Sequence, residues 1–245
     1  ALSVRIADPT FVESVRLRYF DTLITKKTAV ETNIYTVNID EYALDEHGQW
    51  PFPRDIYADI IEDIYKRNAG LVVWNVMMPE RDRQGGDDRL SKTLEDNPTV
   101  LTNLPAGIQK NEPRNPGAAV INSQFLHMLR NYPGIIANIP ALESKALGVG
   151  TIHTDPEIDG VNRRMPLIIA SHNKLYPSLA MEVLRVAAGD TTIQVKMAEN
   201  GVEKVRIPKY GPVTTDNFGR VWIDWSQQIK SVSVTKMPDD FKESI

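Results

Sequence analysis

The 245-residue sequence predicts an α/β fold: a three-layer-like sheet with a parallel βαβαβ first half, antiparallel strands in the second half, and an N-terminal amphipathic helix. Three observations predict it. Strand-like and helix-like segments alternate over the first hundred residues, short strands joined by tight-turn residues follow, and apolar residues near the start recur at helical spacing. The length suits one domain with appended elements.

The first predicted element is a helix over residues 8–27. Its apolar residues fall on what we take to be one stripe of the helix surface, a pattern typical of a helix that packs along one side. The stripe consists of Phe11, Val15, Phe20, Leu23 and Ile24.

The remaining elements of the first half are predicted from residue type and from the prolines and glycines that end helices and strands. β-branched and aromatic residues predict a strand over 33–39, two prolines and a glycine predict a loop over 40–53, and a helix should run from Arg54 to a cap near Gly70. A continuous apolar run over 71–78 predicts a strand covered on both faces. A helix over 87–95 and a strand over 99–104 complete this half.

The second half is predicted from its turns. A loop over 106–117 precedes a helix over 123–131, and strands are expected over 148–153, 161–171, 205–207 and 220–225. Asp159 and Gly160 form a favoured turn pair, and a second turn is expected at His172. A helix over 179–188 should open after Ser178 and close at Gly189.

Composition narrows the function. Lys and Arg total 28 against 32 Asp and Glu, for a net charge of -4, so nucleic acid is not an expected partner. The sequence has no cysteine, which excludes disulfides, zinc–thiolate sites and thiol nucleophiles. No apolar stretch approaches the roughly 20 residues that span a bilayer. Only Gly148 and Gly150 resemble a dinucleotide motif, and they precede a strand, so no cofactor is predicted.

Acidic residues alternate after His153, at Asp155, Glu157 and Asp159. In a strand they would share one face and could hold a hard cation. Pro156 and the following turn interrupt that strand, so a solvated loop without metal is expected, and no catalytic residue is assigned.

The candidate ligand-binding residues lie beyond the first strand. Asp40 and Glu41 follow it directly, where the carboxyl ends of parallel strands border a ligand crevice, and Arg54 could bind a carboxylate from the next helix. Trp50 would form a wall of this pocket, or with the neighbouring prolines a rigid lid over the core. A structural Asp40–Arg54 ion pair is the alternative. Arg163 is the fifth candidate.

Arg163 is followed directly by a second arginine, Arg164. Successive strand positions point to opposite faces, so one of the two arginines can serve a site and the other is expected to be solvated.

These residues resemble the signature of the type-2 CHASE domain, in which a strand ends in Ile-Asp and leads to Gly-x-Trp-Pro-x-Pro-Arg. Further matches occur on the N-terminal helix and in the second half, in the order of the family. The matching residues are Phe20, Asp21, Ile39, Asp40, Glu41, Leu44, Gly48, Trp50, Pro51, Phe52, Pro53, Arg54, Asp159, Gly160, Val161, Arg163, Arg164, Pro166, Leu167, Pro177, Ser178, Leu179 and Ala180. Asn75 and the run of Ile223, Asp224 and Trp225 depart from it.

The resemblance implies an α/β sensory domain on the extracytoplasmic (periplasmic) side of the cell membrane. It also implies covalent continuation into membrane helices and a cytoplasmic output domain such as a cyclase or kinase. Residues 1–30 would form an N-terminal membrane-proximal helix, and residues 31–245 the CHASE-like sensor domain.

The predicted function is therefore sensory rather than enzymatic. The chain would bind an unknown small-molecule or environmental signal, and its N-terminal helix could pack against a second copy to form a homodimer. The alternative is an extracytoplasmic hydrolase that depends on carboxylates or on a metal near His153 and Asp159.

Overall fold

The computed structural model describes residues 10–24, 32–115, 117–225 and 227–242. The helices are α2 (Thr10–Ile24), α3 (Glu41–His47), α4 (Arg54–Lys66), α5 (Asp87–Asp96), α6 (Pro140–Glu143) and α7 (Leu179–Ala187), with 3-10 helices η1 (Ser123–Met128) and η2 (Val234–Lys236). The strands are β1 (Tyr35–Asn38), β2 (Val72–Trp74), β3 (Thr99–Ala106), β4 (Ala118–Ile121), β5 (Asn131–Tyr132), β6 (Gly134–Ile136), β7 (Gly148–Thr151), β8 (Arg164–Pro166), β9 (Ile168–Ser171), β10 (Lys174–Pro177), β11 (Ile193–Ala198), β12 (Gly201–Ile207), β13 (Gly211–Val213), β14 (Arg220–Trp222) and β15 (Lys230–Ser233).

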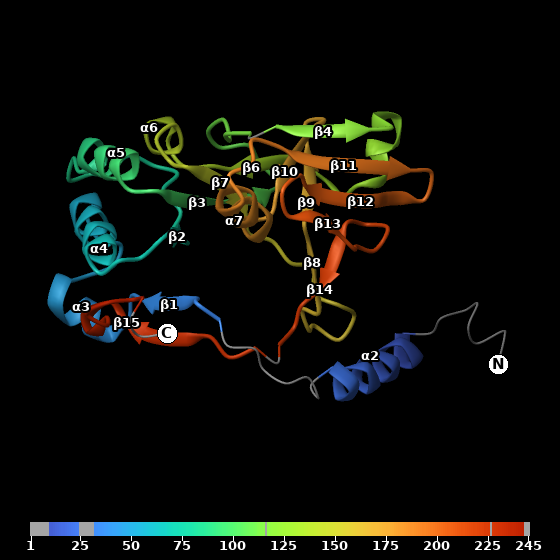
Figure 1. Ribbon diagram of the computed structural model, residues 1–245, viewed down its shortest axis with the longest axis horizontal. Coiled ribbons are helices and arrows are strands. Elements are labelled where there is room, and N and C mark those ends of the chain that lie inside the picture. Colours follow the sequence, from blue (N-terminus) through green and yellow to red (C-terminus); the bar gives the residue numbers. More distant parts are fainter. Residues whose placement is uncertain (1–9, 25–31, 116, 226, 243–245) are drawn as a thin grey trace.

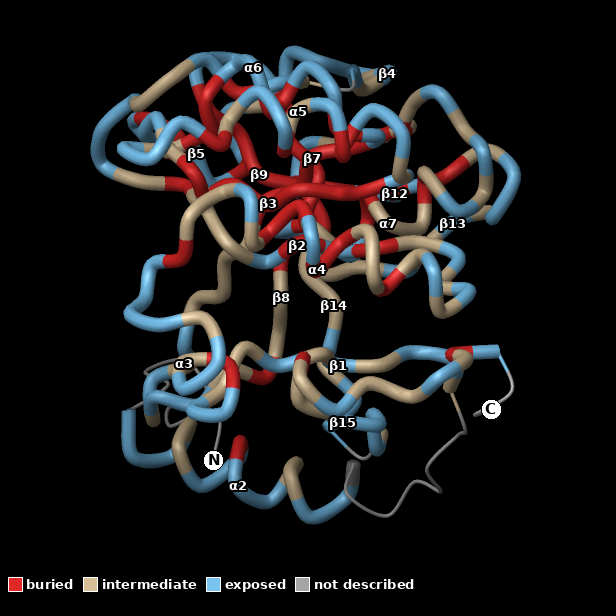
Figure 2. The backbone as a smooth tube through the Cα atoms, turned by 90° about the vertical axis from the view of Figure 1, so that its left-hand side faces the viewer, coloured by how far each residue is buried: buried red, intermediate tan, exposed pale blue. Residues whose placement is uncertain are grey.

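The molecule has two tiers (Figure 1). An upper body holds most of the strands and most of the buried backbone, and a lower tier holds α2, α3, β1 and β15 (Figure 2). The antiparallel pair β8 and β14 runs from the body toward the lower tier and α2. These two strands therefore lie between α2 and the body.

Strand β3 is the centre of the first half of the body. It pairs in parallel with β2 and β7 and antiparallel with β6, because its residues are almost all buried and its backbone groups need partners on both edges. Helices α4 and α5 bury Tyr57, Ile61 and Leu90 in the same core as Leu101 of β3. The mixed α/β class and the predicted helix over 87–95 are confirmed, and the helix predicted from Arg54 is present but ends at Lys66 rather than at a cap near Gly70.

The predicted βαβαβ unit is not confirmed, because β1 does not join this sheet. It pairs in parallel with β15, in a register that places Tyr35 opposite Lys230 and Asn38 opposite Ser233. A strand pattern in the sequence shows that a segment is extended, but not which distant segment its edge will meet. The three-layer arrangement predicted from the alternation therefore becomes several smaller sheets.

The second half is built mainly from antiparallel pairs. The β9–β10 hairpin turns at His172 and Asn173, whose φ angles of 47° and 60° confirm the predicted turn. Strands β11, β12 and β13 form an antiparallel meander, while β4 and β5 join their sheets in parallel. The strand predicted over 161–171 is split into β8 and β9.

Three local predictions differ from the structure. The loop over 40–53 contains α3, and the helix over 123–131 is the shorter 3-10 helix η1. The run over 71–78 yields only β2, in which Val73 is 40% exposed, so this strand is covered on one face rather than two.

The two glycines of β7 have a packing role. A Cβ atom at Gly150 would lie 2.5 Å from the Leu179 Cα of α7, and one at Gly148 would lie 2.4 Å from a carboxylate oxygen of Glu182. The backbone of β7 therefore lies directly against α7, as its glycines allow.

Candidate functional site

Asp40 and Glu41 lie at the start of α3. Asp40 is the N-cap: its Oδ1 accepts a hydrogen bond from the Ala43 backbone N–H at 3.3 Å and another from the Ser233 hydroxyl at 2.9 Å. The same carboxylate thus begins α3 and ties it to the end of β15. Glu41 is exposed in the first turn.

Arg54 is held by partners other than Asp40. Its side chain is 11% exposed, its Nη2 donates to the Glu80 carbonyl at 3.4 Å, and its Nε lies 3.7 Å from Asp87 Oδ1. The Arg54 backbone N–H donates to Asp82 Oδ2 at 2.9 Å. The structural pair predicted between Arg54 and Asp40 is therefore replaced by contacts that join α4 to α5.

Trp50 and Phe52 cover the core beside α4. Phe52 is 2% exposed, whereas Trp50 is 42% exposed with its ring centroid 5.4 Å from that of Phe52. This geometry matches the lid interpretation of the segment. The ligand-binding role of Asp40, Glu41, Trp50 and Arg54 stays a prediction.

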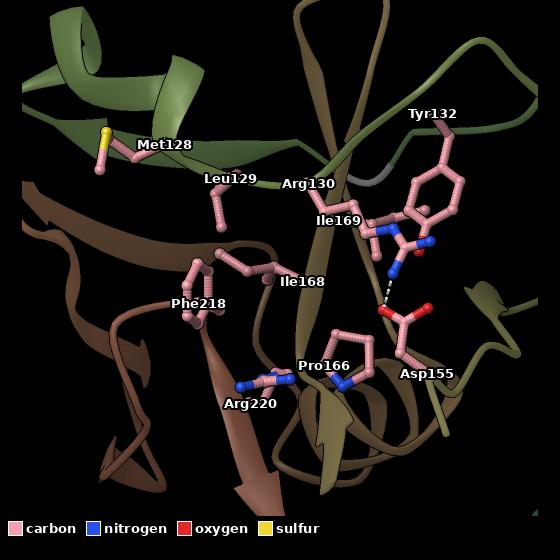
Figure 3. A pocket seen from close by; sticks show the side chains of 10 residues that line it. All are labelled: Met128, Leu129, Arg130, Tyr132, Asp155, Pro166, Ile168, Ile169, Phe218 and Arg220. Carbon is pink, nitrogen blue, oxygen red and sulfur yellow. Dashed lines mark ion pairs between the residues drawn. The ribbon is translucent and has the colours of Figure 1, made fainter. Parts of the chain in front are cut away.

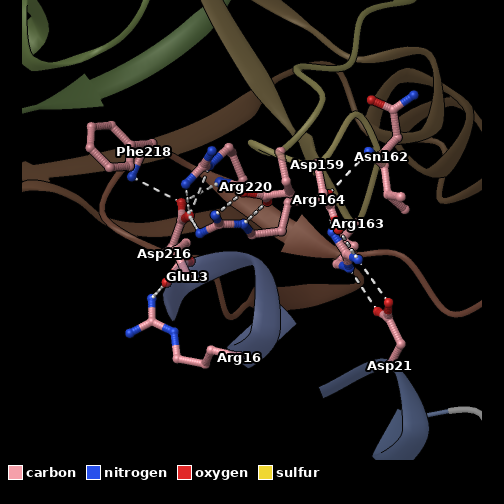
Figure 4. A network of polar contacts seen from close by, with 12 residues as sticks. Glu13, Arg16, Asp21, Asp159, Asn162, Arg163, Arg164, Asp216, Phe218 and Arg220 are labelled. Carbon is pink, nitrogen blue, oxygen red and sulfur yellow. Dashed lines mark hydrogen bonds and ion pairs between the residues drawn. The ribbon is translucent and has the colours of Figure 1, made fainter. Parts of the chain in front are cut away.

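Arg163 occupies the most constrained position of the five candidates. Its side chain is 2% exposed, and its Nε and Nη2 donate to the two carboxylate oxygens of Asp21 on α2 at 2.7 Å each. Its Nη1 and Nη2 also donate to Asp159 at 2.7 and 2.8 Å. We call this arrangement the Arg163 clasp (Asp21, Asp159 and Arg163; Figure 4).

The three groups of the Arg163 clasp shift one another's pKa toward the charged forms. Hydrogen bonds from Arg163 lower the pKa of Asp159 to about 2 and hold the pKa of Asp21 below its ordinary value, while both carboxylates raise the pKa of Arg163. All three groups are therefore charged at neutral pH. The guanidinium fork joins α2 to the turn before β8 through bidentate, charge-assisted hydrogen bonds.

A second network lies beside the clasp. Arg164 donates to both carboxylate oxygens of Glu157 at 2.7 and 2.8 Å and to Asp216 at 3.3 Å, and Asp216 also binds Arg220. Hydrogen bonds from Arg164 lower the pKa of Glu157. The prediction that one of the two adjacent arginines is solvated is wrong, because carboxylates engage both.

The acidic segment predicted as a solvated loop is also largely engaged. The side chains of Glu157 and Asp159 are only 10% and 8% exposed, and Asp155 pairs with Arg130. His153 Nε2 lies 3.0 Å from Asp155 Oδ1. Each of these three acids thus pairs with an arginine.

Helix α2 presents two different faces. Leu17 is 4% exposed, and the Phe20 ring lies 4.4 Å from the Trp222 ring on β14, so this face contacts the rest of the chain together with Asp21. The opposite face exposes apolar side chains that fall within about 120° of the helix circumference at 3.6 residues per turn. These are Phe11, Val12, Val15, Tyr19 and Leu23.

The single apolar stripe predicted for this helix is therefore wrong in one respect. Phe20 belongs to the inner face with Leu17, whereas Phe11 and Val15 lie on the exposed face. Ile24 lies at the end of α2, next to residues outside the described part of the chain.

Sequence reasoning selected Arg163 but missed its partners. Asp21 was singled out only as a match to the family signature, whereas Asp159 was also part of a predicted turn and a candidate cation ligand. Asp159 could have been found from its spacing of four residues to Arg163. Asp21 could not, because it lies 142 positions away from Arg163.

The fold and the clasp define a class: a mixed α/β domain with a helix docked at its edge through an ion pair to a buried arginine. The family model for the CHASE2 domain matches residues 1–245, the whole chain, so the chain belongs to the CHASE2 family. This is a family of extracellular sensory domains of signalling receptors, and it is sensory rather than catalytic.

Two further findings complete the comparison. No curated protein and no solved structure matches the chain. Among the described residues, no helix has the length and apolar character needed to cross a membrane. The division into residues 1–30 and 31–245 stays a prediction.

Proposed function

We propose that the chain is the extracytoplasmic sensory domain of a bacterial transmembrane receptor, and that α2 carries its signal toward a membrane helix and a cytoplasmic cyclase or kinase. Family membership supports the sensory role. The Arg163 clasp is the observation that carries the mechanism, because it fastens α2 to the body through one buried guanidinium.

The clasp suits a two-state switch. Its hydrogen bonds require Asp21 and Asp159 to meet Arg163 in one geometry, so a small displacement of the turn before β8 breaks several bonds together. A ligand that favours one position of this turn would then shift the position of α2. The β8–β14 pair lies beside the clasp and forms the mechanical link to the body.

We also propose that the exposed apolar face of α2 packs against the same face of a second copy. The exposed fractions of Phe11, Tyr19 and Leu23 are 77%, 66% and 51%, which is unusual for one side of a helix whose other side is already docked. A symmetric pair of α2 helices would bury this face. It would also bring together the membrane helices to which the two α2 helices lead.

The test uses the receptor that carries this chain, with its output activity as the readout. Arg163→Lys keeps the positive charge but cannot make the two bidentate contacts, so we expect the basal output to change several-fold in either direction. Arg89→Lys is the matched control, because Arg89 pairs with Asp59 at the surface of α4 and α5, away from α2.

Hydrogen exchange should first show that α2 is less protected in Arg163→Lys than in the unmodified receptor. If the output of the two receptors is then the same, the mechanism is contradicted. An alkaline phosphatase fusion to the chain tests its location. Activity in intact cells is expected, and an inactive fusion with a stable chain would contradict an extracytoplasmic position.

A further inference from the structure

A cavity of about 350 Å³ lies in the body beneath β5, between β8, β9 and the turn before β14 (Figure 3). This volume is within the range of small-molecule sites, which run from about 300 to 1,000 Å³. Apart from Pro166, the residues that line it belong neither to the family signature nor to the Arg163 clasp.

One side of the cavity is apolar. Leu129, Ile168 and Phe218 gather there in Figure 3, and Pro166 lies below them. Leu129 and Ile168 are 4% and 2% exposed and belong to the second core, whereas Phe218 is 56% exposed. This apolar wall would favour an aliphatic or aromatic group.

The other side carries a polar group without a partner. Tyr132 is 8% exposed, and its buried hydroxyl has no hydrogen-bond partner among the described residues. Burial raises the pKa of Tyr132 to about 12, so the hydroxyl stays protonated and can donate. An unsatisfied buried hydroxyl costs folding free energy, which a ligand that accepts its hydrogen bond would recover.

An ion pair stands beside this hydroxyl. Arg130 pairs with Asp155, and the Arg130 guanidinium lies over the Tyr132 ring at 5.2 Å from its centroid. Figure 3 shows the Tyr132 ring, the guanidinium and the carboxylate together at one end of the cavity. Arg130 is 58% exposed, so it can reorient toward a ligand at low cost.

We propose that this cavity binds a small zwitterion with an apolar side chain, of the α-amino acid type. The ligand carboxylate would bind Arg130 and the Tyr132 hydroxyl, its ammonium group would bind Asp155, and its side chain would lie on the apolar wall. The Arg130–Asp155 ion pair would be replaced by two ion pairs, one between Arg130 and the ligand carboxylate and one between Asp155 and the ligand ammonium group. No charge would then be left unpaired in the cavity.

This inference rests on the proposed sensory function and deepens it by naming the ligand class. Asp155 belongs to the segment that supplies Glu157 and Asp159 to the two arginine networks, and Pro166 lies on β8 directly after Arg164 and Met165. Arg220, at the rim of the cavity, binds Asp216, which also binds Arg164. Opening the Arg130–Asp155 pair would therefore act on residues adjoining the clasp.

Isothermal titration calorimetry on the purified 245-residue chain tests the assignment, with L-leucine and L-phenylalanine as probes. We expect saturable binding of at least one of them with one site per chain. Removing either charge, as in 4-methylpentanoate or 3-methylbutylamine, should weaken binding about tenfold or more. A carboxylate or amine that binds as tightly as the amino acid would overturn the zwitterion assignment.

Two variants locate the site. Tyr132→Phe should weaken binding about tenfold while keeping the fold, and Asp155→Asn should weaken it at least as much. Tyr42→Phe is the matched control, because Tyr42 is 57% exposed on α3. Affinity unchanged in Tyr132→Phe and Asp155→Asn, or no binding of either amino acid, would overturn the site. Neither result would touch the clasp mechanism, whose test measures receptor output.

Discussion

Helices α2 and α7 both contact the rest of the chain, but they are held in different ways. In α7, Met181 and Glu182 are fully buried, and the helix backbone lies against the glycines of β7. In α2, Leu17 is buried, and a run of apolar side chains faces outward. One chain thus contains a helix with buried residues along its length and a helix that is docked mainly at one end.

The difference lies in how much of each helix is held. Helix α7 is held by the close approach of its backbone to β7 and by buried Met181. It is also held by the buried Glu182 carboxylate, which accepts a hydrogen bond from the Val149 backbone N–H and pairs with Arg185. Helix α2 is held by an aromatic contact to Trp222 and by the Arg163 clasp, both at one end of the helix. Elements with few buried contacts open at lower free energy than the core, so we expect α2 to open more readily than α7.

The largest effect should come from the scaffold. Gly150→Ala would place a Cβ atom 2.5 Å from the Leu179 Cα, and since both are backbone-fixed, we expect a loss of about 3 kcal/mol in unfolding free energy. Urea denaturation measures it. Gly70→Ala, which meets open space, should stay within about 0.5 kcal/mol, and a similar loss in both variants would contradict the close β7–α7 packing.

Arg163→Ala should affect α2 and leave α7 unchanged. Removing the guanidinium leaves two carboxylates facing each other, and because Asp21 is 36% exposed we expect a cost of about 2 kcal/mol, below that of a fully buried pair. Hydrogen exchange should accelerate in Thr10–Ile24 and stay unchanged in α7. Equal acceleration in both helices would mean that the clasp stabilises the whole fold.

Acid should release α2 by the same route. The pKa of Asp159 falls from its ordinary 3.8 to about 2 in the folded chain, so this carboxylate's contribution to stability is complete above about pH 4 and is lost as pH falls through about 2. Asp21 shifts in the same direction. The NMR signal of the Trp222 indole, which contacts Phe20, should report the change.

The matched variant for the acid titration is Asp159→Asn. It removes the carboxylate, so the step between pH 4 and pH 2 should shrink and the Trp222 signal should already be shifted at pH 7. A transition centred near pH 5 in the unmodified chain would be inconsistent with a depressed pKa.

The smallest effect on stability should come from the outer face of α2. Tyr19→Asp should change the unfolding free energy by no more than about 0.5 kcal/mol, yet abolish self-association in sedimentation analysis. Tyr210→Asp is the matched control, since Tyr19 and Tyr210 are 66% and 64% exposed. A chain that stays monomeric at high concentration without any substitution would contradict the dimer.

Local structure was largely predictable from the sequence. The helix starting after Ser178, the cap at Gly189 and the turn at His172 are all present, because caps and turns depend on side chains that bind their own neighbouring backbone. Helix α3 was missed although Asp40 is a favoured N-cap residue, because the prolines and the glycine around it indicated a loop.

The candidate site was less predictable. Asp40 and Arg54 stood close together in the sequence, and the structure gives each its own partners, Ser233 and Asp87. Arg163 was selected for its place in a motif, but the charge that it meets on α2 was not visible from spacing. The cavity at Tyr132 was not anticipated, since its walls come from four separate segments.

The sequence by itself determined the family, the mixed α/β class and the local turns and caps, because these depend on residue type and on neighbours within a few positions. Only the tertiary structure decided that β1 pairs with β15, that Asp21 meets Arg163, and which face of α2 stays exposed. Periodicity shows that a helix or strand has a face to bury, but the element that this face packs against depends on how the whole chain folds.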